Sequence, residues 1–364
     1  MSWTSFNLRT LLFGTIGLLS LLVMSGSSFM ALDAWLKGRV ADQVVEVNEV
    51  ADALLESNAE IVAERDLAAE FLIAGSSSTT DVFIAVSGRM DASWQKAMVL
   101  LSRERREESM SASHGDNGQL LQDAEAAYGA FVQLRSRLIG ELKKPIGDRN
   151  TGVIEAWYDA AANAIDAIAS LRRVVARKAN SIDAVTQAYS QLKGLALLIT
   201  DYAGRESIII ADAMFSEKPL SARQTRILYD YRGRMDLAWS TISEAADATA
   251  INSDVKTAVE SVRDKFIGEF GKSRKANYAA GISAENYPIS ANQWLNRTRE
   301  AVVSLVALRD ALTRANMVHA KGQSDKAERL LIVVALLLML AMMVTAASFV
   351  IVTRRIIKPI IALT

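Results

Sequence analysis

The stretch Ala291–Ala315, ANQWLNRTREAVVSLVALRDALTRA, decides the fold. Apolar and small residues return in it at alternating steps of three and four, which places them on one face of a helix. These positions are Thr298, Ala301, Leu305, Leu308, Leu312 and Ala315. A helix with such a stripe buries it against partner helices. No proline interrupts the chain from Ser290 to Arg355, so we expect one long helix there.

The composition of the 364-residue chain favours helices throughout, because it holds only four prolines and 19 glycines. Lys plus Arg equals Asp plus Glu at 41 each, a balance that argues against a nucleic-acid partner. The absence of cysteine excludes disulfides, zinc clusters and thiol catalysis. With only His114 and His319, a His-rich metal site is excluded too. We therefore expect no metal and no cofactor.

Enzymatic motifs are also missing from the sequence. It contains no Gly-rich phosphate loop and no nucleophile elbow, and Gly204-Arg205-Glu206-Ser207 lacks the G-x-S-x-G spacing. We expect His319 to lie on a helix face rather than to act as a base. The chain is predicted not to be an enzyme.

Two uncharged apolar runs, Leu11–Ala31 and Leu330–Val352, are long enough to cross a bilayer as helices. The first could instead be a cleavable signal peptide. Arg9 before the first run, with Arg354, Arg355 and Lys358 after the second, weakly favours cytoplasmic termini. The expected organisation is a cytoplasmic segment 1–10, a span 11–31, a periplasmic domain 32–329, a span 330–352 and a linker 353–364.

The segment between the two runs is predicted to be helical, with breaks where turn residues cluster, as at Lys144–Asp148. Ser221 and Ser290 each precede a Gln by three positions, which is the pattern of a capping box. About eight helices are expected: 35–74, 79–111, 118–143, 152–178, 181–215, 221–248, 253–279 and 290–329.

An internal repeat predicts that these helices form two similar sets. GRMDASW at 88–94 recurs as GRMDLAW at 233–239, an offset of 145 residues. Arg65 with Arg205, and Trp157 with Trp294, recur at similar offsets. The expected fold is all-α, with two four-helix modules covering about 35–178 and 181–329. The alternative for the GRMD motif alone is packing, with Met and Trp in the core and Arg and Asp at the rim.

Two arginines are candidates for ligand contact, because each lies on an apolar seam. Arg65 follows Leu54, Asn58 and Ile61 at helical spacing, and Arg205 follows Leu195, Leu198 and Tyr202. A buried guanidinium needs a partner, and its planar fork suits a small anion. We therefore predict a ligand site of Arg65, Arg205, Tyr202 and Asn58. The alternative is internal neutralisation by nearby acids: Glu64, Asp66, Glu70, Asp91, Asp201, Glu206 and Asp236.

Short segments of the chain resemble bacterial transmembrane sensory receptors of the methyl-accepting chemotaxis type. The extracytoplasmic part is similar to the nitrate- and nitrite-sensing domain. The matching segments are Glu64–Asp66, Phe71–Gly75, Ala203–Glu206 and Trp294–Arg299. The resemblance implies that Arg65 and Arg205, one from each half, hold the anion. Asp66 stands where that family has glycine, which keeps the carboxylate-sensing helical bimodular domain as an alternative.

The same resemblance implies a function and partners. Arg354–Thr364 looks like the incomplete start of a HAMP linker, in which Pro359 opens a helix. A receptor of this kind sits in the bacterial inner membrane as a homodimer, senses a small anion in the periplasm and signals to chemotaxis. The alternatives are the sensor region of a histidine kinase or diguanylate cyclase, or a membrane-anchored helical adaptor without a small ligand.

Overall fold

The computed structural model describes residues 8–74, 80–109, 117–180, 183–247, 252–351 and 354. All regular secondary structure in these residues is helical, so the all-α expectation is confirmed for them. The elements are α1 (Leu8–Ala74), α2 (Thr80–Ser109), α3 (Asn117–Leu142), η2 (Ile146–Asp148), α4 (Thr151–Asn180), α5 (Ala184–Phe215), α6 (Ala222–Asp247), α7 (Ser253–Val262), η3 (Arg263–Phe270), α8 (Gly271–Ser283) and α9 (Ala291–Ile351).

The two expected capping boxes are present. Ser221 N–H donates to Gln224 Oε1 at 2.9 Å, and Gln224 N–H donates back to Ser221 Oγ at 3.2 Å. Ser290 and Gln293 repeat the arrangement at 3.0 and 3.3 Å. Each box satisfies backbone N–H groups that have no partner inside the helix, which explains why α6 and α9 begin where they do.

The expected regular helix 253–279 is wrong in its middle, where eight residues, Arg263–Phe270, are π-helical. Buried residues recur along α7, η3 and α8 at steps of mostly four: Val255, Val259, Val262, Phe266, Phe270, Arg274 and Tyr278. A step of four exceeds the 3.6 residues of an α-helical turn, so this stripe would rotate around a regular helix. The wider π-helical turn counteracts that rotation and keeps the stripe facing the core.

The chain forms two compact units, one of Val44–His319 and one that joins Met1–Gln43 to Ala320–Thr364. In the second of these, Ser324 Oγ donates to an Asp42 carboxylate oxygen at 2.5 Å. A Cβ on Gly38 would lie 3.6 Å from the Ala327 Cβ, so the helices α1 and α9 approach closely in this unit.

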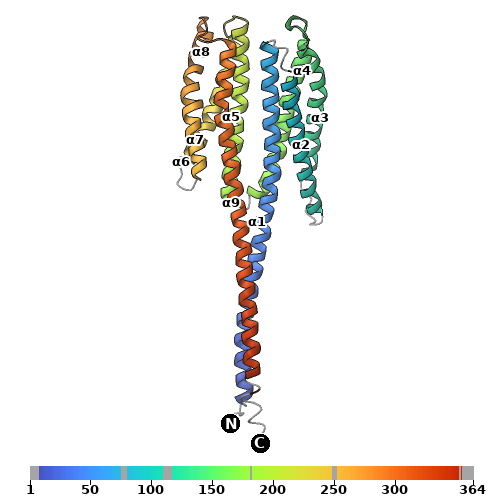
Figure 1. Ribbon diagram of the computed structural model, residues 1–364, viewed down its shortest axis with the longest axis vertical. Helices are drawn as coiled ribbons and strands as arrows, with labels where there is room; N and C mark the ends of the chain where they lie inside the picture. The colour runs from blue at the N-terminus through green and yellow to red at the C-terminus, as the bar shows by residue number, and fades with distance from the viewer. Residues whose placement is uncertain are drawn as a thin grey trace. The chain divides into compact units, whose positions relative to one another are not determined.

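Within the unit Val44–His319, α2 and α3 lie beside α1, while α6 and α8 lie beside α5 (Figure 1). One hydrophobic core cluster draws its buried residues from α5 to α9, between Tyr189 and Ala315. Trp294 and Phe266 are fully buried in it. The stripe predicted for α9, from Thr298 to Ala315, is buried throughout, as its spacing indicated.

Among the described residues, one helix is long and apolar enough to cross a membrane, namely Ala291–Ser348 of α9. Almost none of its most apolar window is buried inside the protein. This agrees with the span expected at Leu330–Val352 and is compatible with membrane association. The span expected at Leu11–Ala31 is not confirmed, and several of its side chains fall outside the description, as do residues 1–7 and 355–364.

Candidate functional site

Arg65 lies in the interior and is already paired. Its residue surface is 3% exposed. Its Nε and Nη2 donate to Asp66 Oδ1 at 3.0 and 2.7 Å. From the other side, Nη1 donates to the Asp201 carboxylate, and Nη2 donates to the Asp201 backbone carbonyl at 3.3 Å. The guanidinium therefore joins α1 to α5.

Arg205 reaches the same carboxylate, because its Nε donates to both oxygens of Asp201 at 3.0 and 3.1 Å. The two arginines do share one anion, and that anion is the chain's own Asp201. Burial acts to lower the pKa of Arg65, but Asp66 and Asp201 outweigh it and hold that pKa above its ordinary value. Burial acts to raise the pKa of Asp201, yet Arg65 and Arg205 bring it below the usual range.

Arg205 was predicted to lie on an apolar seam of α5, and that seam is only partly buried. The Arg205 side chain is 29% exposed, and the other members of its seam are only partly buried. The buried face of α5 runs through Ile199, Ala203, Glu206 and Ile210. The seam chosen from the sequence is the neighbouring face, because α5 is apolar around most of its circumference.

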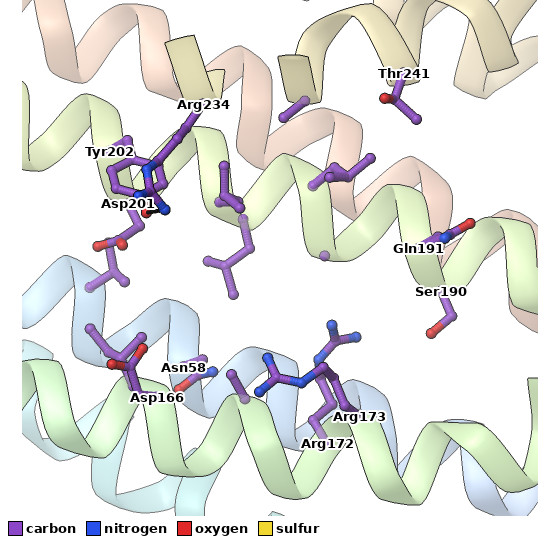
Figure 2. Close-up of a pocket in the computed structure, with 18 of the residues that line it drawn as sticks. Asn58, Asp166, Arg172, Arg173, Ser190, Gln191, Asp201, Tyr202, Arg234 and Thr241 are labelled. Carbon is purple, nitrogen blue, oxygen red and sulfur yellow. Dashed lines mark hydrogen bonds between the residues drawn. The ribbon is translucent and has the colours of Figure 1, made fainter. Parts of the chain in front are cut away.

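An open groove of about 730 Å³ runs between α1 and α4 on one side and α5 and α6 on the other (Figure 2). Asn58, Tyr202 and Asp201 line it, whereas Arg65 and Arg205 do not. Asn58 is 1% exposed, and its Oδ1 is buried without a hydrogen bond. The predicted site residues therefore divide between a closed ion cluster and the wall of the groove beside it.

Sequence reasoning missed two arginines, Arg172 and Arg173 of α4, whose guanidinium groups lie in the groove (Figure 2). Arg172 is half-buried and makes no hydrogen bond or ion pair with any described residue. Its Nη2 lies 2.8 Å from the position of a Cβ on Gly194 of α5, so the guanidinium rests against that backbone. Burial lowers the pKa of Arg172, with Asp52 opposing and Arg173 adding to the effect.

Asp52, the carboxylate that acts to raise the pKa of Arg172, already has another partner. Asp52 of α1 accepts a hydrogen bond from Lys193 of α5, which is 1% exposed. Two cations, Lys193 and Arg172, therefore share one acid at this point, and positive charge is in excess. The signal was available in the sequence: Ile165, Ala169, Arg172 and Ala176 step by four, three and four, and all line the groove.

The unit Val44–His319 also contains two buried Glu–Arg pairs, each near two aromatic rings: one pair lies within α1 to α4, here called the first half, and one within α5 to α9, the second half. In the first, Arg135 donates to Glu64 at 2.6 and 2.9 Å. In the second, Arg274 Nη1 lies 3.6 Å from Glu206 Oε2. The rings of Phe131 and Trp157 accompany the first pair, and those of Phe270 and Trp294 the second, with centroids 5.5 and 5.2 Å apart.

His319 of α9 is half-buried, and its Nε2 lies 2.8 Å from Asp183 Oδ2 at the start of α5. In the described part of the chain, no group of three or more His, Asp or Glu side chains is arranged to hold a metal ion.

Comparison with known proteins gives information on the fold only. No family model matches the chain, and no curated protein matches it. A solved structure, that of the NasR transcription antiterminator, superposes with a TM-score of 0.60 at 12% sequence identity. The match covers 85% of this chain and 83% of that one. The chain is therefore similar to that protein in its helical fold.

Proposed function

We propose that this protein is a membrane receptor for a small anion, which binds in the groove between α1, α4, α5 and α6. The observation that carries this proposal is Arg172, a half-buried guanidinium without an acidic partner among the described residues. A desolvated charge is costly unless it is paired, so an anion from solvent would supply what the chain does not.

The groove offers further polar contacts to such a ligand. Arg173 lies beside Arg172 and is exposed, with Nη2 donating to Ser170 Oγ at 2.9 Å. The side-chain amide of Asn58 lies on the α1 wall. Apolar residues line the space between the polar ends, among them Val62, Ile165, Leu195, Leu198 and Leu237. A carboxylate with a hydrocarbon body would fill this volume better than a bare inorganic ion.

Arg65 and Arg205 then act indirectly. Because Asp201 already occupies the space between them, they are not free to grip a second anion. Asp201 also lines the groove, so its negative charge opposes an anionic ligand there. A bound anion would repel the Asp201 carboxylate, which also holds Arg65, and would so alter the contact of α1 with α5.

A signal to the membrane would pass along α9, a single helix from Ala291 to Ile351. Its buried stripe from Thr298 to Ala315 packs with α5 to α8, and its later part is the candidate span. A ligand shifts such a helix only by its differential affinity for two arrangements. We propose two spans, at 11–31 and 330–352, a periplasmic domain of two four-helix repeats, and a homodimer in the bacterial inner membrane.

The output that this proposal favours is chemotaxis, with a histidine kinase or a diguanylate cyclase as the alternative, and it rests on the resemblance of the linker 353–364 to a HAMP start. The likeness to an antiterminator does not carry that protein's role to this chain at 12% identity. The competing proposal is a helical adaptor without a small ligand. It does not explain why an unpaired arginine, Arg172, lies in a groove.

A thermal-shift measurement tests the ligand. The full chain, purified in detergent, is heated with nitrate, nitrite, acetate, succinate and benzoate in turn at constant ionic strength. We expect one or more carboxylates to raise the Tm, and Arg172→Gln to remove that rise. Arg177→Gln, an exposed change on the same helix, should leave it intact. No shift with any anion, or an equal shift in Arg172→Gln, would overturn the proposal in favour of the adaptor.

Membrane topology is tested separately. We expect the chain to remain in the membrane pellet after alkaline carbonate washing. A periplasm-active reporter inserted near Gly147 should be active, and the same reporter after Thr364 inactive. Activity at both positions would exclude two spans.

A further inference from the structure

Glu206 and Arg274 form an open ion pair inside the second half of the unit Val44–His319. Glu206 of α5 is 1% exposed, and Arg274 of α8 is 5% exposed. Their closest nitrogen and oxygen atoms are 3.6 Å apart, which is beyond a normal hydrogen bond. A buried pair at this separation lacks the short contacts that repay desolvation.

Unsatisfied polar atoms gather around this pair. Buried side-chain atoms without a hydrogen bond here are Glu206 Oε1, Glu206 Oε2, Arg274 Nη1 and Asn277 Oδ1. Three of these four are acceptors, and the one donor, Arg274 Nη1, lies too far from Glu206 to give either carboxylate oxygen a hydrogen. A proton on Glu206 would supply one and would also remove a buried charge.

The first half shows what a closed pair looks like. Arg135 makes two short hydrogen bonds to Glu64, and its Nη1 also binds both oxygens of Asp91 at 2.8 and 3.0 Å. Asp91 and Asp236 occupy the same place in the repeated GRMD motif. Asp236 is instead 57% exposed and lies 3.6 Å from Arg232, so the second pair lacks that support.

Two aromatic side chains of the π-helical segment η3 contact the guanidinium of the open pair. Arg274 lies over the rings of Phe266 and Phe270, at 5.6 and 5.9 Å from their centroids. Such cation–π contacts stabilise the guanidinium without a carboxylate. Phe270 in turn stacks on Trp294 of α9 at 5.2 Å. Movement of Arg274 toward Glu206 would therefore change the contact of Phe270 with Trp294 and so affect α9.

We propose that Glu206 is a proton-binding site: its carboxyl group holds a proton while the pair is open, and releases it to water when the carboxylate closes onto Arg274. Charged and titratable groups around it come from two elements. Arg274 and Tyr278 face it from α8, and Arg232 and Asp236 from α6. On α9, the neutral Trp294 and Thr298 bond to the adjacent Ser207, while the exposed Arg297 bonds to Ser273.

The electrostatics agree with this geometry. Burial raises the pKa of Glu206 to about 7, although Arg274 and the Tyr278 hydroxyl act to lower it. A carboxyl whose pKa is raised on folding binds more protons in the folded state than in the unfolded state over the interval between the two values. Stability therefore falls as pH rises from the ordinary glutamate value to about 7, and the loss is complete above it.

Infrared spectroscopy on the full chain tests the site directly. Between about pH 5 and pH 8 we expect the C=O band of a protonated buried carboxyl to disappear with a midpoint near 7. In Glu206→Gln that change should be absent, and the fall of the Tm with rising pH over the same interval should be smaller. Glu269→Gln, an exposed change on η3, should behave as the parent does.

The wild-type spectrum requires no variant, so misfolding of a mutant cannot hide the answer. If no buried carboxyl band titrates in this interval, or if the band persists unchanged in Glu206→Gln, the proton site is disproved. The site does not depend on the ligand groove, because neither Glu206 nor Arg274 lines it.

Discussion

Arg65 of α1 and Asp201 of α5 lie 136 positions apart in the chain and are joined side chain to side chain. The guanidinium is buried, and the carboxylate is also bound by Arg205 and forms part of the groove wall. One acid therefore holds two helices together and adds negative charge to the neighbouring groove. The two roles can be separated by measurement.

Asp201→Asn should bind anions more tightly. A unit charge about 10 Å away at an effective dielectric constant of about 20 contributes about 1.7 kcal/mol, so affinity for a carboxylate ligand should rise about 15- to 20-fold. Isothermal titration of the detergent-solubilised chain measures this. Asp166→Asn, which removes another groove carboxylate not bound to Arg65, should give a similar gain in affinity without the loss of stability described next.

The same Asp201→Asn change should lower the free energy of unfolding by on the order of 2 kcal/mol. That is less than the ~3–5 kcal/mol typical of breaking a buried pair, because Arg65 keeps its bonds to Asp66. Urea denaturation followed by circular dichroism measures the change. Equal stability of Asp201→Asn and Asp166→Asn would show that the Arg65 pair does not hold α1 to α5.

Gly204 of α5 leaves room for Asp66, since a Cβ there would lie 2.6 Å from Asp66 Cγ. Gly204→Ala should therefore destabilise the protein by about 2 kcal/mol through overpacking against an ion pair that cannot easily move. Gly233→Ala is the matched control. It is helical and exposed, with open space around it, and should stabilise by about 0.5–1 kcal/mol. In thermal melts, Gly204→Ala should lower the Tm and Gly233→Ala should raise it.

Gly194 of α5 fixes where the Arg172 guanidinium rests. A Cβ at this position would lie 2.8 Å from Arg172 Nη2, the far end of a flexible side chain that can give way. Gly194→Ala should change the unfolding free energy by less than about 1 kcal/mol while weakening carboxylate binding. In the Arg172→Gln background, the same change should weaken binding no further. Independent, additive losses would contradict a role through Arg172.

Asp183 caps α5, accepting from Thr186 N–H at 3.0 Å and from Thr186 Oγ1 at 2.7 Å. Burial acts to raise its pKa, but these bonds and His319 bring it below its ordinary value. The resulting stability is present above the ordinary aspartate value and is lost as pH falls through the lower, folded value. Asp183→Ala should cost about 1–2 kcal/mol at neutral pH and less in acid.

Denaturation curves at several pH values check this. Asp183→Asn, which can still cap but carries no charge, should lose the pH-dependent part of the stability and keep most of the rest. A constant difference between parent and Asp183→Ala at every pH would contradict the contribution of the charge.

Much of the helical organisation could be predicted, since it depends on neighbouring residues. The capping boxes at Ser221 and Ser290 are patterns of four neighbouring residues. The stripe of α9 is a repeat with steps of three and four. The π-helix was missed, although buried residues spaced mainly at four along 255–278 indicate that a regular helix would not keep them together. Arg65 was correctly expected inside, while Arg205 was placed too deep because α5 is apolar on more than one face.

The sequence by itself determined that this chain is helical, that its helices carry buried stripes, and that Arg65 lies among them. Only the tertiary structure decided that Asp201 neutralises Arg65 and Arg205, that Arg172 has no described partner, and that Glu206 stays apart from Arg274. Several acids had suitable spacing for each arginine. Which acid meets Arg65 depends on the rotation and offset of α1 and α5, whose contacting residues are 136 positions apart, and no local pattern records this.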